Sequence, residues 1–172
     1  MKSDYSTLEK ATSKPMDMPI EIIPYQKGQE EAIYQLIKKV YDEFVAVDYS
    51  VEGNDFFYDW IKPKNIARRQ KKQVNLWVAH SDSKIVGMIE IRDNKYLSLL
   101  FVDKEYQRRG IATSLFREAL KVCIRRDPKM KKIHLHSSPF AIPVYKKMGF
   151  VPTDSILEEN GIRYLPMEMA IK

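Results

Sequence analysis

The sequence contains one cysteine and three histidines among 172 residues. A single cysteine excludes an intramolecular disulfide, and no Cys/His spacing typical of a zinc site is present, so we expect no metal. No run approaches the ~18 consecutive apolar residues that a membrane-spanning helix needs. The first ten residues, MKSDYSTLEK, lack the apolar segment of a signal peptide. We therefore expect a cytoplasmic protein that does not associate with membranes.

Charge and length limit the remaining classes. The 29 Lys+Arg exceed the 23 Asp+Glu, which gives a net charge of +6 and makes anions plausible partners, whether nucleic acid or a phosphorylated cofactor. A chain of this length suits one domain and can bury enough surface to fold without disulfides. Residues 1–18 hold few large apolar side chains, so we expect a flexible N-terminal tail followed by a single domain at 19–172.

Hydrophobic periodicity predicts an α/β domain. Apolar residues recur at three and four positions between Ala32 and Phe44, as in an amphipathic helix, and alternate at two positions in several shorter runs. The helices that we expect cover 29–44, 54–60 (with Asn54 as N-cap), 111–125 and 139–148. The strands that we expect cover 19–24, 73–79, 84–92, 96–102, 132–136 and 163–171. Pro166 indicates that the last strand lies at an edge or contains a bulge.

The segment between Leu99 and Ser114 carries the strongest chemical signal. An apolar strand runs into a short polar loop, and a long helix opens at Gly110. The first N–H groups of a helix have no intrahelical partner and point toward an anion, while glycine permits close approach and Arg108 and Arg109 add charge. The alternative is an ordinary helix start with solvated arginines. Neither a Walker A loop nor the three-glycine dinucleotide pattern is present.

Three segments resemble the GNAT acyltransferase superfamily, two of them closely and the third more loosely. Val102-x4-Gln107-Arg-Arg-Gly-Ile-Ala112 is similar to its Q/R-x-x-G-x-G/A acyl-CoA signature, with alanine at the last position. Ser137-Ser-Pro-Phe-Ala-Ile-Pro-Val-Tyr-Lys-Lys-Met-Gly-Phe150 resembles its helix ending in Tyr-x-x-x-Gly-Phe, and residues 159–169 resemble its closing strand. The resemblance implies the GNAT fold, a central mixed, mostly antiparallel sheet of about six to seven strands flanked by helices.

The resemblance also implies acetyl-CoA as cosubstrate and a primary amine of a small molecule or peptide as acceptor. Backbone groups of Leu100, Phe101 and Val102 would contact the acetyl and pantetheine groups. The diphosphate would lie on the loop and helix start, mainly on N–H groups, with Ser138 as a further cofactor contact. The loop and helix-start residues are Gln107, Arg108, Arg109, Gly110, Ile111, Ala112 and Thr113.

The reaction implied is direct attack of a neutral amine on the acetyl carbonyl, which requires a base and an acid. Tyr145 matches the family tyrosine that faces the CoA sulfur, so we assign it as the acid; the alternatives are an aromatic that only packs the helix or only binds cofactor. Glu90, a carboxylate in an apolar strand, is our candidate base. Three alternatives remain open: Glu90 faces solvent beside Arg92 and is no base, His136 is the base, or water removes the proton without a dedicated base.

By analogy with the family, the segment after the first strand recognises the acceptor. Between Lys39 and Lys62 there is no Lys or Arg, but acids alternate with aromatic residues, and we expect Asp48 and Glu52 to bind a cationic amine. The alternative is an amphipathic helix pair with a solvated acidic face. The resemblance leaves open the acceptor, the acyl-chain preference and whether the protein is a monomer or a homodimer.

Two other functions compete with an acetyltransferase. One is a GNAT fold that binds acyl-CoA as a sensor without catalysis. The other is a nucleic-acid-binding module, based on the basic clusters Lys62–Lys72 and Arg125–Lys132. We do not expect a nucleic-acid partner, because no helix-turn-helix, zinc-finger or aromatic–basic sheet motif accompanies those clusters.

Overall fold

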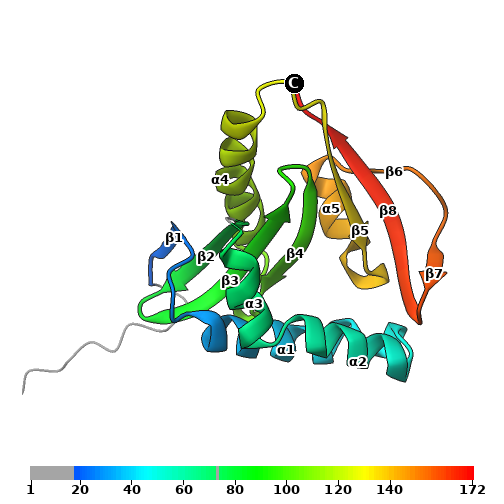
Figure 1. Ribbon diagram of the computed structural model, residues 1–172, viewed down its shortest axis with the longest axis horizontal. Helices are drawn as coiled ribbons and strands as arrows, with labels where there is room; N and C mark the ends of the chain where they lie inside the picture. Colours follow the sequence, from blue (N-terminus) through cyan, green and yellow to red (C-terminus); the bar gives the residue numbers. More distant parts are fainter. Residues whose placement is uncertain (1–17, 73) are drawn as a thin grey trace, which may run out of the picture.

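The computed structural model describes residues 18–72 and 74–172, so the expected tail at 1–18 lies outside the described residues except for Met18. One twisted eight-stranded sheet has the order β1-β2-β3-β4-β5-β8-β6, with β7 paired to β8 (Figure 1). The strands are β1 (Ile20–Pro24), β2 (Asn75–Ser81), β3 (Lys84–Arg92), β4 (Tyr96–Val102), β5 (Lys132–Ser137), β6 (Val151–Pro152), β7 (Leu157–Glu159) and β8 (Ile162–Ala170). The helices are α1 (Glu30–Phe44), α2 (Val51–Trp60), α3 (Pro63–Gln70), α4 (Ile111–Arg126) and α5 (Ile142–Met148), with 3-10 turns η2 (Ala46–Asp48), η3 (Lys104–Tyr106) and η4 (Pro139–Ala141). The mixed α/β architecture is confirmed.

Each face of the sheet is covered by helices because its strands alternate apolar side chains. On one face Ile89 and Leu97 pack with Leu115 of α4 and with α5. On the other face Met88 and Leu99 pack with α1 and α3. The sheet is therefore the middle of three layers, and a side chain's position along its strand decides which helices it meets.

Helix α2 begins earlier than expected, and its cap differs. The N-cap is Ser50, whose Oγ accepts a hydrogen bond from the Gly53 N–H at 3.1 Å. The expectation that Asn54 caps this helix is wrong. Asn54 instead lies inside the first turns, where its Oδ1 accepts a 2.6 Å hydrogen bond from the Tyr41 hydroxyl and its Nδ2 donates to the Ala46 carbonyl.

Helix α3 was not expected, because residues 62–72 read as a basic cluster. Pro63 stands at its first turn, where a missing N–H costs nothing, and Ile66 is its buried anchor against the sheet. This helix places Arg69 over β3, which matters for the site below.

The C-terminal strands also depart from expectation. β8 pairs with β5 at residues 165–170 and with the two-residue β6 on its other side, so it is not an edge strand there, and no bulge interrupts its register with β5 at Pro166. Asn160 and Gly161 both have positive φ and join β7 to β8 in a two-residue turn, the arrangement that Asn-Gly favours.

The β7–β8 turn fastens to the start of α2. The Gly161 carbonyl accepts a 2.9 Å hydrogen bond from the Ser50 N–H. A Cβ on Gly53 would stand 2.6 Å from the Gly161 oxygen, so only glycine fits there without a shift. We call this contact between Ser50, Gly53 and Gly161 the strap. In Figure 1 the β7–β8 turn lies beside the end of α2 that is away from α3.

Candidate active site

The strands β4 and β5 part in the middle of the sheet. They are the parallel pair of the sheet, and they pair at Tyr96–His134 and Leu97–Leu135 and at no later position. Beyond those residues they diverge in Figure 1, and α5 lies between them in this view. The β4 residues past Leu97 therefore have a strand partner, β3, on one side and none on the other. An opening with exposed backbone groups is a place where an extended ligand can lie between two strands.

A β-bulge sits at the point of divergence. Glu90 of β3 pairs with Leu99, and the next residue, Ile91, pairs with Leu97, so Ser98 is an additional residue on β4. The Ser98 hydroxyl donates to Glu90 Oε1 at 2.9 Å, with the Glu90 carbonyl at 3.2 Å. The bulge is thus held by side chains as well as by register.

Glu90 is fully buried, which contradicts the alternative of a solvent-facing carboxylate beside Arg92. Its partner is Arg69 of α3, whose Nε donates to Glu90 Oε2 at 3.1 Å and whose Nη1 donates to the Trp60 carbonyl at 2.8 Å. Both carboxylate oxygens therefore accept a hydrogen bond. The sequence did not point to Arg69 or Ser98, because each meets Glu90 only through the fold.

The loop and helix start predicted to bind diphosphate have the required shape. Gly110 has φ +76°, its Cβ position has no atom within 4 Å, and no side chain caps the start of α4. Arg108 also adopts a positive φ, and it lies exposed beside Arg109. The free N–H groups, the helix dipole and two guanidinium groups fit a phosphorylated group approaching this end of α4.

Gln107 has a different position from the other loop residues. Its Nε2 donates a 3.0 Å hydrogen bond to the Val102 carbonyl, so its side chain closes the loop against the end of β4. The Val102 carbonyl is therefore occupied. Of the other expected cofactor residues, Ile111 is buried in the core while Ala112, Ser138, Leu100 and Phe101 are half-buried and Thr113 is exposed.

Tyr145 of α5 is 7% exposed and packs edge-on against Phe150. Burial raises the pKa of Tyr145, and the nearby Tyr96 and Tyr49 raise it further, so the phenol stays protonated at neutral pH. Within the described residues, 18–72 and 74–172, the Tyr145 hydroxyl has no hydrogen-bond partner. The group is a protonated donor, the form that an acid requires.

An aromatic group lines the opposite face of the opening. His136 of β5 stacks on Tyr164 of β8 with ring centroids 4.1 Å apart. Tyr96 of β4 contacts the His136 ring edge-on, with centroids 5.5 Å apart. Burial lowers the pKa of His136, although the Glu159 carboxylate opposes this, and the imidazole is therefore neutral at pH 7. Sequence analysis missed the two tyrosines, since only the sheet order brings β4, β5 and β8 together.

The predicted acidic segment covers the last turn of α1, η2 and α2, and its six acids are Asp42, Glu43, Asp48, Glu52, Asp55 and Asp59. Phe57 of α2 lies 6.2 Å from Phe101 of β4, ring centroid to centroid, so this segment stands next to the opening. Three of its six acids form ion pairs with lysines: Asp42, Glu43 and Asp59. Among the described residues, Asp48, Glu52 and Asp55 form no such pair, and large apolar side chains beside them are exposed, with Phe56 at 65%.

Asp103, at the end of β4, was not expected to matter. Its side chain is 2% exposed and accepts from the ammonium groups of Lys39 and Lys84 and from the Glu105 N–H. Burial alone would raise the pKa of Asp103, but these donors outweigh it and lower the pKa. The carboxylate ties α1 to the loop that leads to Gly110.

Metal and membrane features are not found in the described part of the chain. No group of three or more His, Cys, Asp or Glu side chains within it is placed to hold a metal ion. Likewise, among the helices of the described residues, none combines the length and apolarity that a membrane crossing needs.

The sequence of this chain is similar to those of known acetyltransferases. The sequence profile of the Acetyltransferase (GNAT) domain matches residues 45–171. N-acetyltransferase 8 of Homo sapiens is 28% identical over 134 residues, covering 71% of this chain, which spans only 55% of that protein's length. The uncharacterized N-acetyltransferase YafP of Escherichia coli is 27% identical over 131 residues, covering 76% of this chain and 81% of that protein.

Solved structures agree on the fold. A GCN5-related N-acetyltransferase from Rhodopseudomonas palustris superposes with a TM-score of 0.75 at 19% identity, covering 91% of this chain and 98% of that chain. The PaiA N-acetyltransferase of Thermoplasma acidophilum, solved in complex with coenzyme A, gives 0.73 at 20% identity, covering 90% and 100%. The family profile, the sheet that opens between β4 and β5 and the bare start of α4 agree, and the chain belongs to the GNAT family of acyltransferases.

Proposed function

We propose that this protein transfers an acetyl group from acetyl-CoA directly to a primary amine. The observation that carries the proposal is the divergence of β4 from β5 beside the uncapped start of α4. A thioester lying between the strands and a diphosphate lying on the helix N–H groups would together place the acetyl carbonyl at the opening. The PaiA protein, of the same fold, is described in complex with coenzyme A, which supports this cosubstrate.

In this proposal Tyr145 protonates the departing thiolate. A proton on its hydroxyl is held at neutral pH because burial raises the pKa of Tyr145. The thiolate takes that proton as the carbon–sulfur bond of the tetrahedral intermediate breaks, and solvent reprotonates the phenolate. Leu100, Phe101 and Val102 would hold the acyl group through their backbone, although the Val102 carbonyl is already bound by Gln107.

Two side chains compete for the role of base. Glu90 would take a proton from the amine only by giving up a bond to Arg69 or Ser98, since both of its oxygens are in use. His136 is neutral at pH 7, because burial lowers its pKa, and it lies on the acceptor side of the opening. We keep Glu90 as the first candidate and His136 as the alternative. Their variants give different pH profiles, as described below.

For the acceptor we propose a cationic amine, attracted by Asp48 and Glu52. Among the described residues, neither carboxylate forms an ion pair. Exposed apolar side chains beside them could contact the carbon chain of an acceptor amine. The test is to compare an amine panel between wild type and Asp48→Asn/Glu52→Gln. Unchanged selectivity between cationic and neutral-tailed amines would exclude this role.

The activity itself is tested by release of free thiol from acetyl-CoA across an amine library. Tyr145→Phe should lower kcat by about 10²–10³, as loss of a general acid does, with little change in acetyl-CoA affinity. The second candidate function is a non-catalytic acyl-CoA sensor. Binding of acetyl-CoA with no thiol release for any amine would favour the sensor over the enzyme.

Location and assembly belong to the same proposal. We propose a cytoplasmic protein that acts as a monomer or a homodimer, without nucleic acid or membrane as its acceptor. Light scattering coupled to size exclusion separates the two assembly states, and the exposed apolar side chains of α2 are the surface to substitute if a dimer is found.

A further inference from the structure

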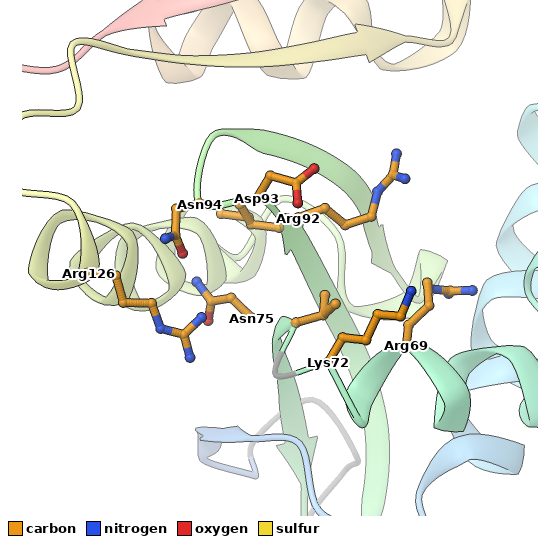
Figure 2. A pocket seen from close by; sticks show the side chains of 9 residues that line it. Arg69, Lys72, Asn75, Arg92, Asp93, Asn94 and Arg126 are labelled. Atoms are coloured by element: carbon orange, nitrogen blue, oxygen red, sulfur yellow. The ribbon is translucent and has the colours of Figure 1, made fainter.

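The two basic clusters of the sequence meet at one end of the sheet, away from the phosphate-binding helix start. Lys62–Lys72 forms α3 and its end, while Arg125–Lys132 begins at the last turn of α4. Between them lies the turn that joins β3 to β4. A pocket of about 460 Å³ opens where these three segments meet (Figure 2).

The lining of this pocket is strongly cationic. It includes Arg69, Lys72, Arg92 and Arg126, against the single acid Asp93. In Figure 2, Arg69, Lys72 and Arg92 extend to one side of the pocket, and Arg126 stands on the side of α4. A volume of this size is within the usual range for small-molecule sites, about 300–1,000 Å³.

Part of the positive charge of this pocket is not neutralised by the described protein. Arg92 Nε and Arg69 Nη2 have no hydrogen-bond partner among residues 18–72 and 74–172, but protein atoms cover both, so an anion would reach them only after a side-chain movement. No ion pair involving Lys72 or Arg92 occurs within the same part of the chain. Cationic side chains that line a pocket without an ion pair leave it with a positive charge, which an anion from outside can neutralise.

Stabilisation of helix ends accounts for only part of this charge. Arg69 and Arg126 lie in the last turns of α3 and α4, where cations interact favourably with the helix dipole. Arg92 is on a strand, and it lies over the rings of Trp60 and Tyr96 at 5.3 and 5.1 Å. The Trp60 ring also faces Arg69 at 4.5 Å, so two guanidinium groups are held in place around one aromatic ring.

We propose that this pocket binds a small polyanion carrying two or more phosphate groups, at a site separate from the acetyl-CoA diphosphate. Three guanidinium groups and one ammonium suit several closely spaced phosphates better than one carboxylate. Arg126 closes α4 and Gly110 precedes its first residue, so a 16-residue helix, about 24 Å long, separates the two anion sites.

The pocket connects to the acyl site through Arg69. The same guanidinium group that borders the pocket donates to Glu90, and Glu90 accepts from the bulge residue Ser98. A polyanion that attracts Arg69 therefore competes with Glu90 for it. We expect occupancy of the pocket to be felt at the point where β4 leaves β5.

The test is isothermal titration with inorganic triphosphate at 0.15 M salt, which requires no acetyl-CoA and no acceptor. Wild type should show saturable binding with one component that belongs to this pocket, besides any binding of triphosphate at the helix start. Lys72→Gln/Arg92→Gln should bind at least about tenfold more weakly, since two charged donors are lost. Lys72→Glu alone should also weaken triphosphate binding. Because Lys72 is exposed, this variant should fold normally, so it serves as a control in case the double variant misfolds.

Two controls locate the site. Lys27→Glu changes the same charge at an exposed position before α1, and Arg108→Gln alters the helix-start site; neither should change the component of triphosphate binding that Lys72→Gln/Arg92→Gln weakens. Equal binding by wild type and both Lys72 variants would overturn the proposal, as would loss of that component in Arg108→Gln. A 20-nucleotide RNA that bound through Lys72 and Arg92 more tightly than triphosphate would also overturn it, in favour of a nucleic-acid surface.

Discussion

The ion pair between Arg69 and Glu90 is expected to be a major contributor to stability. Arg69 is 12% exposed and Glu90 is fully buried, 3.1 Å from Nε to Oε2. Removing one partner leaves a buried charge uncompensated, which typically costs about 3–5 kcal/mol. We therefore expect Arg69→Met and Glu90→Leu each to lower the free energy of unfolding by about that amount, a large part of the 5–15 kcal/mol of an ordinary domain.

The double variant is the informative one. Replacing both partners by apolar side chains leaves no buried charge, so Arg69→Met/Glu90→Leu should lose no more than about 2 kcal/mol. Its remaining cost comes chiefly from the Trp60 carbonyl, which loses its donor from Nη1. The coupling energy of the cycle should therefore be several kcal/mol, well above the additivity error of about 0.5 kcal/mol.

Urea unfolding followed by far-UV circular dichroism measures these differences. With a slope of about 2 kcal/mol per molar, each single variant should unfold about 2 M earlier than wild type. The exposed pair Asp59–Lys62 is the matched control, and Lys62→Met should unfold with wild type. Losses that simply add in the double variant would refute the reasoning, because they would mean that neither charge depends on the other.

Three further predictions concern the strap, the loop and pH. Gly53→Ala should cost about 1–3 kcal/mol and raise the acceptor KM more than the acetyl-CoA KM, because its Cβ would meet the Gly161 oxygen at 2.6 Å; equal unfolding midpoints would contradict the strap. Asp103→Asn should lower the free energy of unfolding by about 1–2 kcal/mol at pH 7. The difference from wild type should vanish in acid. Folding lowers the pKa of Asp103 below its unfolded value of 3.8, so the carboxylate stabilises the fold above pH 3.8 and loses this effect as the pH falls through the folded-state pKa. The folded-state pKa of His136 lies below 6.5, so the unfolded chain takes the proton first and stability declines as pH falls below 6.5; His136→Gln should remove that decline. If His136 is the base, kcat/KM of this variant should also lose its acidic limb, whereas Glu90→Gln should retain it.

The regular elements could be predicted because their signals are local. Helices α1 and α4 repeat apolar residues over several turns, and β3 and β4 are joined by a turn with two residues in left-handed conformation. Helix α3 has one large apolar anchor, Ile66, in eight residues, which is too few to show a period. β6 and β7 are two and three residues long and have no period at all, although the Asn160-Gly161 pair signals the turn between β7 and β8.

The residues of the candidate site also fall into those that the sequence could predict and those that it could not. The loop proposed to bind diphosphate is a contiguous motif, so its residues could be named from the sequence. The partners of Glu90 could not, since Arg69 comes from a separate helix and Ser98 reaches it only because β4 has an additional residue in its register with β3. Tyr96, His136 and Tyr164 likewise meet only because β5 lies between β4 and β8 in the sheet.

The strap has a consequence for how the protein is made. Ser50 and Gly53 leave the ribosome long before Gly161, so the start of α2 has no hydrogen-bond acceptor at the Ser50 N–H until β7 and β8 are synthesised. Contacts between such distant positions form late, because the loop between them must close first. A nascent chain that ends before Leu157 should therefore carry an intact start of α4, where we propose that phosphate binds, while the proposed acceptor side at α2 is still unformed. Release of the last strands would be the step that completes the enzyme.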